Sequence, residues 1–153
     1  MYTKQEASLL RQQFWTAFGQ YMQPIPSADG EKINWVNYKT GNKQVAFKMQ
    51  TDGSNAFVAI EIFHKNPIIR QSYFEKFLQF KKAFKQSAKE DWLWEIHYTD
   101  EHGKNLSRIY KKLDNTNVLN KDNWPQLISF FKSGIIALDQ FWSEYKHGFE
   151  DLA

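Results

Sequence analysis

Hydrophobic residues recur at helical spacing near the N-terminus of the chain. Apolar side chains three and four positions apart over residues 10–21 form one stripe, which predicts a helix over about residues 4–22. Thr3 and Glu6 have the spacing of a capping box, in which each side chain accepts a hydrogen bond from the backbone N–H of the other residue. Two prolines then end the pattern, so we expect residues 23–32 to form a surface loop.

Three strand-like runs follow, at residues 33–39, 43–51 and 57–64. Turn sequences at residues 40–42 and 52–55 separate them, which predicts an antiparallel meander. In the second run apolar and polar residues alternate, as expected when one face of a strand is buried. In the third run both faces are apolar, which predicts a central strand that is covered on both sides.

A second helix is predicted to begin at Asn66-Pro67, because Asn caps free backbone N–H groups and Pro fits the first helical turn. Its apolar face continues to about Lys85. Residues 92–99 and 106–113 then flank the turn sequence Asp100-Glu101-His102-Gly103. They predict a hairpin with one tryptophan-rich face, which a helix must cover.

The strongest periodic signal lies in the C-terminal part of the sequence. Apolar residues at intervals of three and four predict a helix of about 27 residues over 123–149, which would be about 40 Å long. The residues of this stripe are Leu127, Phe131, Ile135, Leu138, Trp142, Tyr145 and Phe149. Such a helix either lies across the whole sheet or projects into a partner.

These elements predict an α+β fold with the order α-β-β-β-α-β-β-α in one domain over residues 1–153. The predicted sheet has five mostly antiparallel strands, and three helices pack against it. Aromatic residues make up 17% of the 153 residues, so rings must fill much of the core.

The composition also limits the cellular setting. There is no cysteine, which excludes disulfides and thiolate metal sites and favours a reducing compartment, so we expect a cytoplasmic protein. We expect no signal peptide, because the N-terminal residues contain no uninterrupted apolar segment and no small-residue cleavage site. No apolar run reaches about eighteen residues. We therefore expect a soluble protein with no membrane contact.

The net charge of +3 is unevenly distributed. Basic residues outnumber acidic ones over residues 70–89 and again over 104–112, whereas acidic residues dominate 139–151. If the two basic segments adjoin in space, they could contact the phosphates of a nucleic acid. The alternative is that they are ordinary solvated side chains. The residues of this predicted basic surface are Arg70, Lys76, Lys81, Lys82, Lys85, Lys89, Lys104, Arg108, Lys111 and Lys112.

Three residues are candidates for chemistry. Glu61 lies in a run that is apolar on both faces, and an unpaired buried carboxylate is costly, so it needs a partner or a role. An edge position, or an ion pair with Lys48 or Arg108 on adjoining strands, would explain it without catalysis. Glu95 and His97 are two positions apart on one predicted strand and so share a face, as a joint acid–base or metal role requires. Solvated positions on an open face would also explain this pair.

Signatures of common cofactor and metal sites are missing. The four histidines show no zinc-ligand spacing. The sequence contains no glycine-rich dinucleotide loop, no Walker lysine loop and no Gly-x-Ser-x-Gly elbow. We therefore expect neither a metal nor a cofactor.

Aromatic and turn positions over nearly the whole chain form a recognisable set. They are Trp35-x-x-Tyr38-x-Thr40-Gly41, the strand over 57–63, the helix over 73–84, the hairpin that begins at Trp92, and the terminal helix over 124–149. This set resembles a bacterial family catalogued as domain of unknown function 4268. Domains of that family often look like C-terminal partners of nuclease-like or restriction-related modules. The resemblance implies an accessory role near DNA-directed defence.

The element order is also similar to that of the PD-(D/E)XK nucleases, whose acidic pair would correspond to Asp52 and Glu61. Phe63 stands where the lysine of that motif belongs, which implies an inactive copy. Secretion-chaperone-like domains, which dimerise and are usually acidic, have a similar order. The leading hypothesis is a non-enzymatic binding or accessory module that contacts nucleic acid. The alternatives are a divergent metal-dependent nuclease and a domain that binds a partner protein, or a second copy of itself, through the C-terminal helix.

Overall fold

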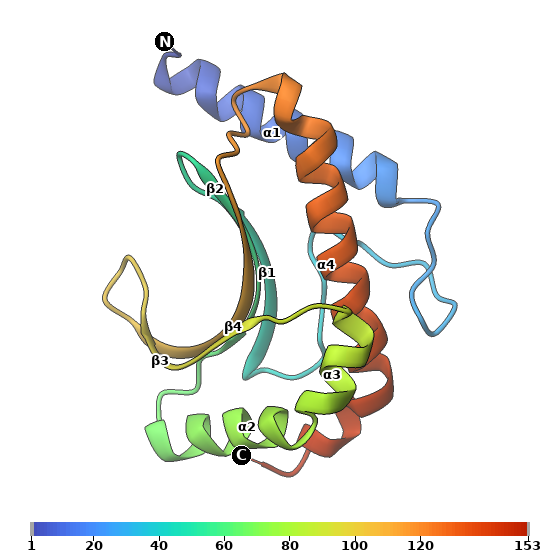
Figure 1. Cartoon of the computed structure of the whole chain (residues 1–153), viewed down its shortest axis with the longest axis vertical. Helices are drawn as coiled ribbons and strands as arrows, with labels where there is room; N and C mark the ends of the chain where they lie inside the picture. Colours follow the sequence, from blue (N-terminus) through green and yellow to red (C-terminus); the bar gives the residue numbers. More distant parts are fainter. Residues whose placement is uncertain (1, 153) are drawn as a thin grey trace.

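The computed structural model describes residues 2–152 and places the helices on one side of a four-stranded antiparallel sheet (Figure 1). The strand order is β1-β2-β4-β3, and every neighbouring pair is antiparallel. Two short 3-10 segments flank the last helix, at Lys121–Asn123 and Lys146–Phe149. The helices are α1 (Lys4–Met22), α2 (Pro67–Gln79), α3 (Lys81–Ala88) and α4 (Trp124–Tyr145), and the strands are β1 (Val45–Thr51), β2 (Asn55–Ile62), β3 (Leu93–Thr99) and β4 (Asn105–Asp114).

Local sequence signals set the starts of the first two helices, as predicted. The Thr3 hydroxyl accepts a hydrogen bond from the Glu6 backbone N–H, and the Glu6 carboxylate accepts one from the Thr3 N–H, both at 3.1 Å. At the start of α2 the Asn66 side chain accepts from the Ile68 N–H at 2.8 Å, and Pro67 occupies the first helical turn. Each cap satisfies a backbone donor that the helix itself leaves free.

Aromatic rings fill the space between α4 and its neighbours. The Phe131 ring of α4 lies 6.0 Å from the rings of both Phe14 and Phe18 on α1. All three side chains are fully buried, and each such burial contributes about 1.5–3 kcal/mol of transfer free energy. At Gly134, α4 approaches β2 so closely that an added Cβ would lie 2.8 Å from a Val58 methyl carbon. The long helix thus lies along its own sheet, which was the first of its two predicted placements.

The predicted five-stranded sheet is wrong by one strand, because residues 33–39 form an irregular loop with a turn at residues 35–37. The Asn34 side chain accepts hydrogen bonds from the backbone N–H groups of Val36 and Asn37. Trp35 extends from this loop into the core, and its indole N–H donates to the Ile25 carbonyl at 2.9 Å. Local side-chain bonds here replace a strand ladder.

The predicted second helix is in fact two, so the element order is α-β-β-α-α-β-β-α. The break falls at Phe80, whose backbone (φ −96°, ψ 11°) is not helical. Its ring packs 4.8 Å from that of Tyr145 on α4. The terminal helix also ends earlier than predicted, at Tyr145, and the 3-10 segment that follows places the Phe149 ring 4.4 Å from that of Phe77.

Within residues 2–152, one face of the sheet is not covered by any helix. β2 is central, as predicted, but its coverage on both sides by other layers is not found: all four helices lie on the same side (Figure 1). A β-bulge between Glu95 and Tyr98 distorts β3, and the β3–β4 hairpin curls away from the helices. A groove lies on the face opposite the helices. None of the described helices combines the length and apolar character that crossing a membrane requires.

Candidate functional site on the uncovered face of the sheet

A groove of about 470 Å³ lies on the uncovered face of the sheet, between the β1–β2 turn and the β3–β4 turn. Strands β1, β2 and β4 form its floor, and the two turns form its ends. The lining side chains include Lys48, Asp52, Phe57, Glu61, Tyr98, residues 100–102 and Arg108.

Arg108 is held at the floor of this groove by two tyrosines. Its guanidinium carbon lies 3.9 Å from the centroid of the Tyr98 ring and 3.8 Å from that of Tyr110. Phe57 lies at 5.5 Å. A cation over an aromatic face gains about 0.5–2 kcal/mol, more when water is excluded. The two rings therefore fix the plane of the guanidinium.

The Arg108 side chain has no anionic partner in the part of the chain that the structure describes. The residue is only 7% exposed, yet its buried Nε–H makes no hydrogen bond there, and no carboxylate oxygen lies within 4.0 Å of the guanidinium. The other buried arginine, Arg70, also forms no ion pair among the described residues, but it donates to the His64 carbonyl at 2.8 Å. Buried polar groups are normally hydrogen-bonded. The unsatisfied Nε–H therefore distinguishes Arg108 from Arg70.

Glu61 lies beside Arg108 in the cross-strand register but does not pair with it. Burial raises the pKa of the Glu61 carboxyl, and the charges of Lys48 and Arg108 oppose that shift. The predicted edge position is wrong because β2 is central. Lys48 and Arg108 do lie on the adjoining strands, but neither forms an ion pair with Glu61 among the described residues.

Glu95 and His97 do not join Glu61 in a common centre. In the register Glu61 and Glu95 lie on opposite sides of Arg108, two strand spacings or about 10 Å apart. The Glu95 carboxylate accepts a hydrogen bond from the Tyr110 hydroxyl at 2.6 Å. Burial, followed by this bond, raises the pKa of the Tyr110 hydroxyl, while Arg108 opposes the shift. His97 is exposed, and the bulge interrupts the alternation on which its pairing with Glu95 depended.

The arrangement offers no metal centre within residues 2–152, where no three His, Asp or Glu side chains cluster as ligands would. Asp52 and Glu61 both line the groove, but the Asp52 carboxylate accepts from the backbone N–H groups of Ser54 and Asn55 and so serves the β1–β2 turn. The position two after Glu61 is Phe63. The residues that are present therefore do not fit the metal-binding pattern of a PD-(D/E)XK nuclease.

The predicted basic residues lie on different faces of the molecule. On β4, Lys111 points to the helix side and pairs with Glu90 at 3.1 Å, with a side chain only 10% exposed. Lys112 is on the opposite face and pairs with Asp114 at 3.2 Å. Lys104 lies over the Phe63 ring, and Lys76 lies over the Phe80 ring.

The lysines of α3 are the part of the basic set that stays together. Lys81, Lys82, Lys85 and Lys89 are all exposed on α3 or its C-terminal cap. Lys81 lies over the Trp94 ring, and Lys85 pairs with Asp91 at 3.1 Å. The α3 helix that carries this cluster lies on the helix side of the sheet (Figure 1), whereas Arg108 lines the groove on the uncovered face. Its predicted contact with nucleic acid stays a prediction.

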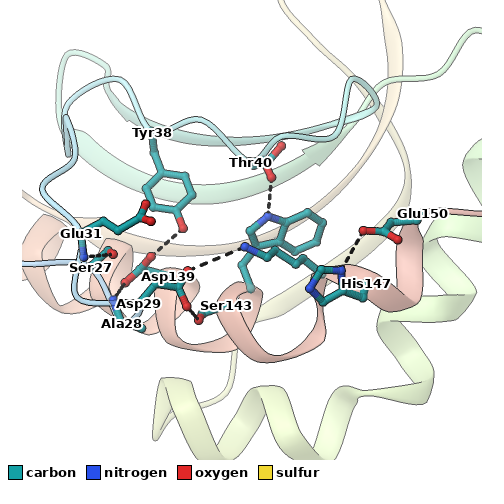
Figure 2. A network of polar contacts seen from close by, with 12 residues as sticks. Ser27, Ala28, Asp29, Glu31, Tyr38, Thr40, Asp139, Ser143, His147 and Glu150 are labelled. Atoms are coloured by element: carbon teal, nitrogen blue, oxygen red, sulfur yellow. Dashed lines mark hydrogen bonds and ion pairs between the residues drawn. The ribbon is translucent and has the colours of Figure 1, made fainter.

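A second polar network, which sequence reasoning missed, joins α4 to the loop before β1 (Figure 2). Asp139 is 3% exposed, and its carboxylate accepts from the Ala28 N–H at 2.7 Å and from the Tyr38 hydroxyl at 2.6 Å. Burial, and then the bond to Asp139, raises the pKa of Tyr38 well above its usual value. Both carboxylate oxygens have partners, so this network stabilises the fold.

The sequence model described as "Domain of unknown function (DUF4268)" matches residues 10–146, which contain all four strands and almost all of the helical layer. No curated protein matches the chain. No solved structure matches it. The predicted resemblance to this family is confirmed, and the chain belongs to the DUF4268 family of domains of unknown function.

Proposed function

We propose that this chain is a non-enzymatic binding module that holds an anionic group of a partner on Arg108. One observation carries the proposal: a buried guanidinium, stacked between Tyr98 and Tyr110, has no anion of its own within 4.0 Å among the described residues. Taking an arginine out of water is costly, and a counter-ion normally offsets that cost. A partner that supplies one gains a charge-assisted contact.

The geometry suits recognition of an oxyanion. A guanidinium presents a flat set of N–H donors that match a carboxylate or phosphate in pairs. Stacking fixes its plane before any ligand arrives, so little side-chain entropy is lost on binding. A groove of about 470 Å³ is within the range of small-ligand and side-chain pockets.

Anion-dependent stability tests the proposal. Replacing chloride by acetate at constant ionic strength should stabilise the protein and raise its melting temperature. At an acetate concentration ten times its Kd, the free energy of unfolding should increase by about 1.4 kcal/mol. Arg108→Lys should lose most of the effect because an ammonium cannot bind a carboxylate in the same paired geometry. Arg11→Lys, at an exposed position of α1, is the matched control. Equal acetate responses in all three proteins would refute the proposal.

A second candidate function is contact with nucleic acid through α3. Four exposed lysines in nine consecutive positions support it, because clustered lysines gain affinity for phosphates through counterion release. This surface is separate from the groove, so the two candidates can be tested independently.

A further inference from the structure

The charge layout of the groove indicates what kind of partner Arg108 receives. Resting on the proposed function, we propose that the anionic group is the carboxylate of an acidic residue in a protein segment, with basic residues on either side of it. The floor of the groove carries two basic side chains, Arg108 and Lys48, and one acidic side chain, Glu61. Its two ends carry acids: Asp52 on the β1–β2 turn, and Asp100 with Glu101 on the β3–β4 turn.

The negative charges at the ends are fixed in place. The Asp100 carboxylate accepts from the backbone N–H groups of His102 and Lys104 at 2.9 and 2.8 Å. Asp52 accepts from Ser54 and Asn55 in the same way, at 2.9 and 2.7 Å. These bonds hold the pKa of both carboxyl groups below the usual range, so both remain ionised at neutral pH. Neither carboxylate can rotate out of the groove without breaking the hydrogen bonds that form its β-turn.

This layout disfavours a polyphosphate chain. Four acidic side chains line the groove (Asp52, Glu61, Asp100 and Glu101), against two basic ones (Lys48 and Arg108). A nucleic-acid backbone would place phosphates against both acidic ends, where like charges repel. A segment with one central carboxylate and flanking ammonium groups meets an opposite charge at Arg108 and at both acidic ends, while Glu61 beside Arg108 opposes the central carboxylate. Phe57 gives the aliphatic stems of the flanking residues an apolar surface.

The test compares four probes by NMR, with the Arg108 Nε–H resonance as reporter. The probes are acetate, the capped peptides Lys-Gly-Glu-Gly-Lys and Gly-Gly-Glu-Gly-Gly, and a single-stranded oligothymidylate. We expect the lysine-flanked peptide to bind about two- to thirtyfold more tightly than the glycine-flanked one, because each of the two exposed ion pairs adds about 0.2–1 kcal/mol. Glu101→Gln should reduce that ratio, and Glu144→Gln, at an exposed position of α4, should not.

The outcomes separate this inference from the proposed function. Equal affinity for the two peptides, or a ratio that Glu101→Gln leaves unchanged, would overturn the inference. Tighter binding of the oligothymidylate at Arg108 would also overturn it, while leaving anion binding at Arg108 intact. If no probe, acetate included, moves the Arg108 resonance, the proposed function itself fails.

Discussion

The Tyr38 hydroxyl donates a 2.6 Å hydrogen bond to the buried carboxylate of Asp139, joining the loop before β1 to the middle of α4. Close by, the Trp142 indole N–H of α4 donates to the Thr40 carbonyl at 2.7 Å. Gly41 follows with φ of +79°, a conformation that suits glycine. The Trp-x-x-Tyr-x-Thr-Gly sequence is therefore the segment that fastens this loop to the long helix.

Tyr38→Phe should lower the free energy of unfolding by about 1.5–3 kcal/mol at pH 7, since it removes a hydrogen bond to a buried charge. The pKa of Tyr38 is raised in the folded state, so its contribution is complete below about pH 10 and is lost as the pH rises further. The advantage of the natural protein over Tyr38→Phe should shrink by about 1 kcal/mol between pH 10 and pH 11. Denaturant unfolding at both pH values measures this. An advantage that grows with pH would contradict the account.

Gly134→Ala tests the close approach of α4 to β2. The new Cβ would lie 2.8 and 2.9 Å from the two Val58 methyl carbons and 3.0 Å from Lys111 Cε. We expect a net loss of about 1–2 kcal/mol, since overpacking costs more than the helix propensity of alanine returns. The control is Gly53→Ala, which has open space around the added methyl and should change stability by less than about 0.5 kcal/mol. Equal thermal unfolding of the two variants would show that α4 and β2 are not in close contact.

Sequence patterns predicted the elements whose signals are local. The Thr3 cap, the Asn66-Pro67 start and the two hairpin turns each depend on a few neighbouring residues, and the structure contains all of them. Residues 33–39 look like a strand because they are rich in apolar and aromatic side chains. In the structure Trp35 is buried and Tyr38 half-buried through contacts with distant residues. The break at Phe80 likewise reflects packing on α4. Such tertiary contacts leave no local pattern.

The candidate groove was harder to foresee. The sequence places Arg108 in a basic surface. Only the strand register shows that it lies between Glu61 and Glu95. The bulge in β3 also places the Tyr98 ring against its guanidinium, which no sequence pattern indicates. Asp139 had a usable signal, since it is four residues after Ile135 and three before Trp142 on the apolar stripe of α4. A carboxylate at such a position requires buried partners.

Glu61→Gln should strengthen anion binding in the groove. Burial raises the pKa of Glu61, so its protonated form is favoured in the folded state and the ionised form at neutral pH works against stability. The variant should be as stable as the natural protein at pH 7, or more stable, and any advantage should shrink as the pH falls toward about 4.5 and be absent below it. Acetate titrations should give a lower Kd for the variant. A higher Kd, or a stability loss above about 2 kcal/mol, would show that the carboxylate is needed.

Replacing Lys81, Lys82, Lys85 and Lys89 by Glu tests the second candidate function. We expect weak binding of single-stranded DNA that falls steeply with salt and is abolished in the fourfold variant, because the released counterions come from these contacts. Fluorescence anisotropy at several salt concentrations measures this. A variant with Lys4, Lys32, Lys39 and Lys121 changed to Glu carries the same total charge and should retain most of the binding. If both variants lost DNA binding to the same extent, the lysines of α3 would have no specific role in that binding.

The most direct test of the anion-binding account is the Arg108 Nε–H resonance in the natural protein as acetate replaces chloride at constant ionic strength. The account predicts a saturable shift that is shared by amides of β2 and β4 around Phe57 and is absent from the Nε–H of Arg11. A resonance that does not move, or one that drifts linearly together with that of Arg11, would contradict it.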